Sequence, residues 1–492
     1  MDFSPNDASC YHRVMIIDGI SASHVAENSS VYERAIASFL QFIERKLGVL
    51  VLRDVRNNRE DVALDAPLTF GMRLLKEGII VDFGRSFQYS DEPQFKSWYA
   101  ICNNEFKHMC GGTKWGDDKG ALFAALAEAQ ERYIWLTQID YFRNPTYATE
   151  AEISKKCSYI STRRIVGFSD EQRKSPARHL TDKSRFLWIE GRSLVRRSPV
   201  YIPARVVSGA RKRLETEGGD EPFIRASTSI GLATWPEKSG AELRGALEAI
   251  EREAYMIMWL NQLTLPRYSL ESIAAQDTSL AHLFAKCKRY LLKPHVISLI
   301  TDAPTHAIAV VIEDLSGHAP RFSVGLNAHR SVIHATEKAL TEAIRSHRGC
   351  RQWHATGNVF DTSTPVEKIG HRDRLYYWAL PENAKHHEFM IAGEEIAYEE
   401  KSWEKDTEDA HLTRILEWCA SKGFECVSVP LTSSKKNITH WHINMVIIPE
   451  LQPTYLTEDT RAFGGTRWRD VPKLFGYKPL SAPFAVRPHP FS

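Results

Sequence analysis

The sequence lacks the features that mark several classes of protein. Its eight cysteines form no CxxC pair and no spacing typical of zinc ligands. No apolar run approaches the ~20 residues that span a bilayer, and the first residues lack the basic-then-apolar form of a signal peptide. We therefore expect a soluble, cytoplasmic protein with reduced thiols and no membrane partner.

An excess of one charge is also missing. The 63 Lys and Arg residues nearly balance the 61 Asp and Glu residues, so the formal net charge is +2. That value does not favour nucleic acid as a partner. Basic residues are concentrated between residues 163 and 213, a segment that contains 14 basic and 4 acidic residues. This segment is typical of a solvated face, with a groove for an anionic ligand or peptide as the alternative.

The length of 492 residues fits one large domain with an appendage, or two domains. We predict a small N-terminal unit over residues 1–77, with a helix at 31–48 and a strand at 49–55. The main domain is predicted over residues 78–492. In it, strands or glycine-bearing loops precede long helices rich in small residues, segment 383–410 is a charged connection, and residues 451–492 form an irregular tail that contains several prolines.

Charge recurs inside helices that otherwise look buried. "EAQERYIWL" (128–136) and "EAIEREAYM" (248–256) repeat the spacing ExxER, and the predicted helices at 119–136, 240–260 and 331–348 share a weak signature. Positions i and i+3 share a helix face, so both glutamates of each pair can contact the same ligand. Carboxylates in apolar surroundings need a compensating cation, and Mg²⁺ prefers oxygen ligands together with substrate phosphates. The spacing therefore predicts Mg²⁺ with a nucleotide triphosphate, and a solvated helix face with local ion pairs is the alternative.

A standard phosphate-binding loop is absent from the sequence. "GGTKWG" (111–116) nevertheless places Lys114 just before the first of these helices. Lysine and free backbone N–H groups at a helix start would favour phosphate there. A plain polar turn is the alternative.

At these motifs the sequence resembles the YcaO family, ATP-using enzymes that modify peptide backbone amides. The family form AxxSAxxExxER reads "ALFAALAEAQER" here, with Ala124 in place of serine. The form SNGxAxG…EAxxxxLxExxERD reads "SIGLATWPEKSGAELRGALEAIERE", with Ile230 for asparagine and Gly240 for a glutamate that helps bind metal in the family. The form ALTExxQxR reads "ALTEAIRSHR", with Arg345 for glutamine.

The resemblance implies an α+β, YcaO-like fold in which mixed sheets pack with long helices around a central nucleotide site. It implies ATP and Mg²⁺ as cofactors. Metal would be held by Glu128, Glu131, Glu248, Glu251 and Glu342, and nucleotide by Lys114, Ser229, Arg252 and Arg345.

The end of the chain bears on the choice of reaction. Family members that make azolines tend to end in a PxPxP-like terminus that reaches the active site, and this sequence ends "VRPHPFS". The resemblance therefore favours a cyclodehydratase that converts Cys, Ser or Thr of a ribosomally made precursor peptide to azolines by phosphorylating the amide oxygen. Thioamide or amidine formation and a non-catalytic, peptide-docking scaffold are the alternatives. The candidate catalytic residues are Pro488, Pro490 and Ser492.

The same resemblance implies partner proteins. We expect a precursor peptide and a separate partner, resembling ubiquitin-activating enzymes, that binds the leader peptide. An FMN-dependent dehydrogenase would be a third component, and a homo-oligomer is left open.

Overall fold

The computed structural model describes residues 65–210, 214, 221–355, 357, 360–371, 373–439 and 441–491. The chain divides into two compact units, Met1–Thr69 and Phe70–Ser492, and the second holds almost all of the described residues. The helix predicted at 31–48 and the strand predicted at 49–55 lie outside the described residues. The domain boundary after residue 77 stays a prediction.

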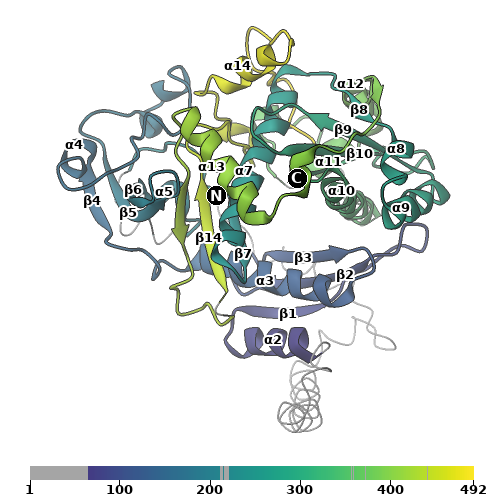
Figure 1. The fold of residues 1–492 in the computed structure, drawn as a ribbon, viewed down its shortest axis with the longest axis horizontal. Helices are drawn as coiled ribbons and strands as arrows, with labels where there is room; N and C mark the ends of the chain where they lie inside the picture. The colour runs from purple at the N-terminus through teal and green to yellow at the C-terminus, as the bar shows by residue number, and fades with distance from the viewer. Residues whose placement is uncertain are drawn as a thin grey trace. The chain divides into compact units, whose positions relative to one another are not determined.

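An antiparallel sheet in the order β1-β2-β3 opens the second unit (Figure 1). Helix α3 lies along β2 and β3 and buries Leu122 and Leu126 against the sheet, together with Leu74 of helix α2. The elements are α2 (Asp65–Lys76), β1 (Ile80–Arg85), β2 (Lys96–Cys102), β3 (Met109–Lys114) and α3 (Asp118–Thr137).

A second sheet repeats this plan later in the chain. Its order is β11-β10-β9-β8-β12, and helix α10 packs on β10 and β11 as α3 packs on β2 and β3. Helices α8 and α9 pack together beside β9. The elements are β8 (Arg267–Tyr268), α8 (Leu270–Ala274), α9 (Thr278–Arg289), β9 (Leu292–Leu299), β10 (His306–Asp314), β11 (Phe322–His329), α10 (Val332–Ala355) and β12 (Glu395–Ile396).

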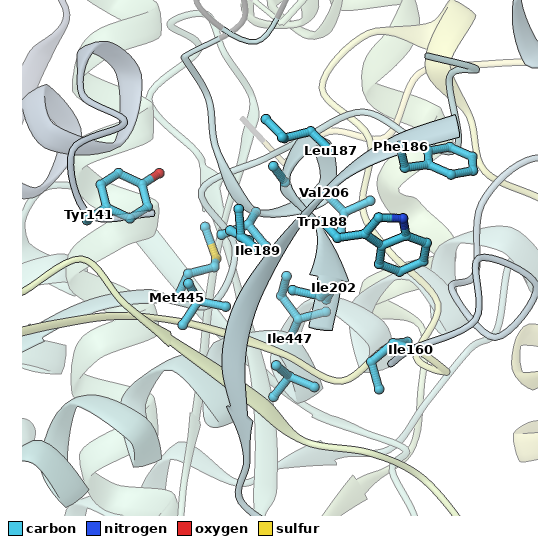
Figure 2. Packing of buried hydrophobic residues seen from close by; sticks show 14 of the residues in the cluster. Tyr141, Ile160, Phe186, Leu187, Trp188, Ile189, Ile202, Val206, Met445 and Ile447 are labelled. Atoms are coloured by element: carbon cyan, nitrogen blue, oxygen red, sulfur yellow. The ribbon is translucent and has the colours of Figure 1, made fainter. Parts of the chain in front are cut away.

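The third sheet joins segments that are far apart in the sequence. Its order is β4-β5-β13-β14-β7, with β6 beside β5, and helix α7 packs on β14 and β7. Figure 2 shows its core, where Trp188 and Ile189 of β5 meet Met445 and Ile447 of β14. The elements are β4 (Thr146–Thr149), β5 (Arg185–Ser193), β6 (Ser198–Pro203), β7 (Leu232–Trp235), α7 (Lys238–Asn261), β13 (Val427–Pro430) and β14 (His442–Ile447).

Two segments are more regular than predicted. The charged connection at 383–410 contains a short helix and strand β12, and the tail at 451–492 contains helix α14. Helix α14 forms because Trp468 and Val471 are buried in the core that α7 also enters, and because Asn261 Nδ2 donates to the Trp468 carbonyl at 2.6 Å. The remaining α-helices are α4 (Glu150–Ile153), α5 (Ala204–Val207), α11 (Asp373–Ala379), α12 (Glu388–Ile391), α13 (Glu408–Ser421) and α14 (Arg467–Leu474).

No helix in the described ranges is long and apolar enough to span a bilayer.

Glycines bring the long helices onto their strands. A Cβ at Gly112 of β3 would lie 1.8 Å from the carbonyl oxygen of Ala121 in α3. A Cβ at Gly325 of β11 would lie 2.1 Å from the carbonyl oxygen of Ala339 in α10. Since both obstacles are backbone atoms, the pairing of a strand glycine with helix alanines sets the separation of strand and helix.

Gly325→Ala is therefore expected to destabilise the protein by about 3 kcal/mol or more, because the added methyl group must push α10 away from β11. The control is Gly349→Ala in helix α10, where an added Cβ meets nothing within 4 Å. That change should instead stabilise by about 0.5–1 kcal/mol. Denaturant unfolding measures both, and equal effects of the two substitutions would contradict the packing argument.

Candidate functional site

Three glutamates, one on each long helix, accept a hydrogen bond from the strand or turn that precedes their own helix. The same strand–helix unit therefore occurs three times, as β3–α3, β7–α7 and β11–α10. In each unit the close approach of helix to strand lets a carboxylate reach a backbone N–H group. The bonds join Gly111 N to Glu128 Oε2 at 3.3 Å, Gly231 N to Glu248 Oε2 at 2.9 Å, and Leu326 N to Glu342 Oε2 at 2.7 Å.

On each helix, the residue three positions after this glutamate forms a hydrogen bond with the strand of another unit. Glu131 of α3 accepts from β7, Glu251 of α7 accepts from β11, and Arg345 of α10 donates to β3. The three units thereby close into a ring, which we call the carboxylate ring. These bonds are Thr234 Oγ1 to Glu131 Oε2 at 2.8 Å, Ala328 N to Glu251 Oε2 at 3.0 Å, and Arg345 Nη1 to Gly111 O at 3.1 Å.

Arginines on the same helices only partly neutralise these carboxylates. Arg252 lies 3.4 Å from Glu248 and 3.2 Å from Glu251, and Arg345 lies 3.7 Å from Glu342. On α3, Arg132 lies 3.6 Å from Glu128 and 3.9 Å from Glu131. Five carboxyl groups thus share three guanidinium groups.

The two most buried carboxyl groups of the ring have raised pKa values. Glu131 is 6% exposed and Glu251 is 5% exposed. Burial raises the pKa of each to about 8, against the opposing effect of the neighbouring arginine. The Glu248 carboxylate raises both pKa values further, and Glu342 raises that of Glu251. The structure therefore brings all five predicted glutamates into one electrostatic group.

This group fits a divalent cation by the chemistry of its donors. All of its candidate ligands are carboxylate oxygens, the type that Mg²⁺ prefers, and a bound cation would compensate the charge of Glu131 and Glu251 once they lose their protons. Within the described ranges, no three His, Cys, Asp or Glu side chains lie close enough together to coordinate one metal ion. Since Mg²⁺ commonly takes one or two carboxylates and fills the rest of its shell with water and phosphate, the donor set is sufficient.

The raised pKa values predict how the metal-free protein responds to pH. Glu131 and Glu251 bind protons more tightly in the folded chain than in the unfolded one, where carboxyl groups titrate near 4.5. The free energy of unfolding should therefore fall as pH rises from about 4.5 to about 8, by at most about 1.4 kcal/mol per pH unit for each group. Denaturant unfolding at several pH values measures this slope. A Glu131→Gln/Glu251→Gln double variant should lose it, and an unchanged slope in that variant would show another origin.

Positive charge gathers where α3 begins. Lys114 Nζ lies 3.2 Å from the Asp117 carboxylate, which also caps α3 by accepting from Gly120 N at 2.8 Å. Asp117 thus contacts both kinds of group that the sequence suggested for phosphate, the lysine and a backbone N–H. Lys338 of α10 lies nearby: burial lowers its pKa, and the charge of Lys114 lowers it further. Sequence reasoning missed Lys338, although it stands one helical turn before Glu342 and so shares its face.

Gly240, a departure from the family motif, lies in a packed group at the start of α7. A Cβ at Gly240 would lie 2.0 Å from Cδ1 of Trp235, so the indole ring occupies the space into which a side chain at 240 would project. The Arg244 guanidinium lies 3.2 Å above the Trp235 ring centre and pairs with Glu408 at 3.0 Å. Predicted nucleotide ligand Ser229 lies in the turn before β7, where its carbonyl accepts from Leu232 N at 3.0 Å.

The C-terminal tail reaches the same centre. The guanidinium group of Arg252 lies 4.1 Å from the ring centre of Phe491. His489 is buried, and its Nε2 lies 2.9 Å from the Tyr455 carbonyl oxygen. Pro488 is buried and Pro490 is half-buried between these anchors, whereas Ser492 lies outside the described residues. The tail therefore packs on the arginine that pairs with Glu248 and Glu251.

Solved structures of low sequence identity share this fold. A heterocyclase in complex with substrate and cofactor aligns with a TM-score of 0.65 and 18% identity over 85% of this chain and 57% of its own. The heterocyclase TruD aligns with a TM-score of 0.54 and 17% identity over 78% of this chain and 60% of its own. This chain therefore spans less than two thirds of the length of these two heterocyclases.

A third solved structure matches nearly over its whole length. YcaO from Methanopyrus kandleri, bound with AMPPCP and Mg²⁺, aligns with a TM-score of 0.55 and 16% identity over 83% of this chain and 96% of its own. These likenesses confirm the predicted α+β fold of mixed sheets and long helices.

Comparison of sequences settles the family. No curated protein matched the sequence. The family model described as YcaO cyclodehydratase, ATP- and Mg²⁺-binding, matches residues 114–452, which is more than half of the chain. That span contains all three strand–helix units from Lys114 onward, with the five glutamates of the carboxylate ring. The resemblance seen in the sequence is therefore confirmed, and the chain belongs to the YcaO family.

Proposed function

We propose that this chain is an ATP-dependent cyclodehydratase that converts Cys, Ser or Thr residues of a ribosomally made precursor peptide to azolines. The observation that carries the proposal is the carboxylate ring with the tail packed on Arg252, in a chain of a family described as ATP- and Mg²⁺-binding. Thioamide or amidine formation at the same centre is the alternative.

The roles of the residues follow from their charge and position. Mg²⁺ would be held by Glu128, Glu131, Glu248, Glu251 and Glu342, and when bound it supplies positive charge next to the transferred phosphoryl group. Lys114 and Lys338, both close to Asp117, would bind phosphate oxygens at the start of α3. Arg252 stands between the glutamates and the tail, where it would bind the phosphoryl group as it moves to the peptide.

The proposed reaction needs few chemical groups from the protein. A side-chain thiol or hydroxyl of the peptide attacks the preceding amide carbon, and the amide oxygen accepts the γ-phosphoryl group of ATP. The carbon–oxygen bond then breaks, phosphate leaves with the electron pair, and the peptide has lost one water. Positioning and charge neutralisation dominate such a transfer. Pro488 and Pro490 would orient the reacting peptide, since the tail lies against Arg252 and Tyr255.

Partner proteins belong to the same proposal. We infer that a separate leader-peptide-binding protein, resembling ubiquitin-activating enzymes, presents the precursor. A dehydrogenase that uses FMN would act on the azoline product. One solved structure of similar fold is the E. coli microcin synthetase McbBCD complex, which is a multiprotein assembly.

The test is a reconstituted reaction of the purified chain with its leader-binding partner and precursor peptide. Mass spectrometry should show loss of about 18 Da per modified residue, dependent on Mg-ATP, with one phosphate released per ring. Calorimetry of Mg-ATP binding separates an enzyme from a peptide-docking scaffold. Absence of nucleotide binding together with retained peptide binding would favour the scaffold.

Removal of residues 488–492 distinguishes the azoline reaction from its alternative. In the azoline reaction the deletion should lower turnover at least about tenfold, because the prolines no longer orient the peptide. Thioamide or amidine formation should continue. Since His489 and Phe491 are buried, thermal unfolding must accompany the assay, and Pro490→Ala provides a milder variant with both anchors intact. Full azoline formation by the deletion variant would remove the prolines from the catalytic set.

A further inference from the structure

Arg225 is a half-buried arginine without a carboxylate partner among the described residues. It lies in the segment between α5 and β7, and its Nη1 has a long hydrogen bond of 3.4 Å to the Val166 carbonyl oxygen. Burial lowers the pKa of Arg225 to about 10, and no charge in the described ranges opposes that shift. A partly buried cation of this kind favours an anion beside it.

Several other arginines in the described ranges pair with carboxylates. Arg374 lies 2.7 Å from Glu458, and Arg205 lies 3.4 Å from Glu221. The exposed Arg163 lies 3.2 Å from Asp182. Within the part of the chain that the structure describes, Arg225 differs from these three arginines in having no carboxylate partner.

The Arg225 side chain lines a small pocket that it shares with Arg252. Arg252 Nη1 is buried without a hydrogen-bond partner, although it lies within ion-pair distance of Glu251. Ile230 provides an apolar wall where the family motif has asparagine. The pocket thus offers two guanidinium groups and hydroxyl or amide groups to a small anion. The lining includes Arg225, Thr228, Ile230, Arg252, Gln452 and Thr454.

We propose that the pocket between Arg225 and Arg252 binds inorganic phosphate, the anion released when the amide carbon–oxygen bond breaks. This step rests on the proposed function, because it is the reaction that produces phosphate beside Arg252. Arg252 contacts both the glutamates and the pocket, so an anion can pass from the carboxylate ring to Arg225 without leaving guanidinium contact. Planar guanidinium groups bind phosphate oxygens through paired hydrogen bonds.

The assignment of phosphate to this pocket uses different cations from those assigned to nucleotide. Arg225 donates to the Val166 carbonyl oxygen, whereas Lys114 and Lys338 lie beside Asp117 at the start of α3. Phosphate held by Arg225 would leave those lysines free for the next nucleotide. Arg225 is thus assigned to the product, and Lys114 with Lys338 to the nucleotide.

The experiment measures phosphate binding to the full chain without nucleotide, by calorimetry at constant ionic strength. Arg225→Gln should weaken phosphate binding about tenfold or more, because a charge-assisted contact is lost. Arg225→Lys should weaken it less, since the charge remains. Arg163→Gln is the matched control, because it removes an equal charge from an exposed pair, and it should bind phosphate like the parent protein. Thermal unfolding without phosphate should show no loss of stability in Arg225→Gln, since that change removes a half-buried charge without a carboxylate partner in the described ranges.

Separate outcomes would overturn the proposal. One is failure of the parent protein to bind phosphate. A second is displacement of phosphate by an equal concentration of acetate, which would identify a carboxylate site for a peptide side chain. A third is an equal loss of Mg-ATP affinity in Arg225→Gln, which would place Arg225 on the nucleotide. None of these measurements needs peptide turnover. Their results can therefore be interpreted even if the cyclodehydratase assay fails.

Discussion

Glu251→Gln is expected to lower ATP-dependent water loss at least about a hundredfold while leaving the fold intact. Glutamine keeps the volume and can still accept from Ala328 N, which donates to Glu251 at 3.0 Å. The pKa of Glu251 near 8 means that the metal-free protein already holds this carboxyl group largely protonated at pH 7, so a neutral amide suits the fold. Amide oxygen is a weak replacement for carboxylate in neutralising a divalent cation, and activity should fall for that reason.

The measurement compares product mass and phosphate release for Glu251→Gln, Glu128→Gln and the control Glu417→Gln. Glu417 is exposed on α13, away from the carboxylate ring, so its replacement should change neither activity nor stability. Calorimetry should show weaker Mg-ATP binding in the two site variants. Full activity in both site variants would reject the assignment of metal to the carboxylate ring.

Arg374→Met is expected to destabilise the protein by about 3–5 kcal/mol, the largest effect on stability that we predict. Arg374 and Glu458 have side chains that are 0% exposed, and Arg374 donates to Glu458 Oε1 from both Nε and Nη2. Removing the guanidinium group leaves a buried carboxylate whose remaining cationic partner among the described residues is Arg461, at 2.7 Å. Denaturant unfolding measures the loss.

The Arg374→Met/Glu458→Gln double variant tests whether the loss comes from the stranded charge. It should recover part of the stability, since neither charge remains buried alone. Arg163→Gln, in an exposed pair, should change stability by no more than about 0.5 kcal/mol. Arg374 also donates to the Tyr455 carbonyl oxygen at 3.0 Å, the same oxygen that His489 contacts. Catalytic activity should therefore fall along with stability, because the tail loses an anchor.

Local patterns in the sequence predicted the parts of the structure that depend on local patterns. The three long helices α3, α7 and α10 lie where periodicity and small residues placed them. The glutamates of ExxER share a face because helix geometry requires it. The roles of those glutamates in nucleotide chemistry stay predictions, since they came from family resemblance.

Other features depend on contacts that no local pattern encodes. Thr234 binds Glu131 across 103 positions of sequence, and Ala328 binds Glu251 across 77. Helix α14 was missed because its stability comes from burying Trp468, which outweighs the helix-breaking tendency of Pro472. Arg225 carries no sequence signal, because the absence of a partner becomes visible only after the chain has folded.

The carboxylate ring has a consequence for how mutations combine. Each strand–helix unit holds one carboxylate itself and supplies the bonding partner for a residue of another unit, so a change in one unit alters the neighbours on both sides. Effects of substitutions at Glu131, Glu251 and Arg345 should therefore depart from additivity, unlike those of distant surface residues. Whether the protein accepts a substitution at one of these positions therefore depends on which residues occupy the other two.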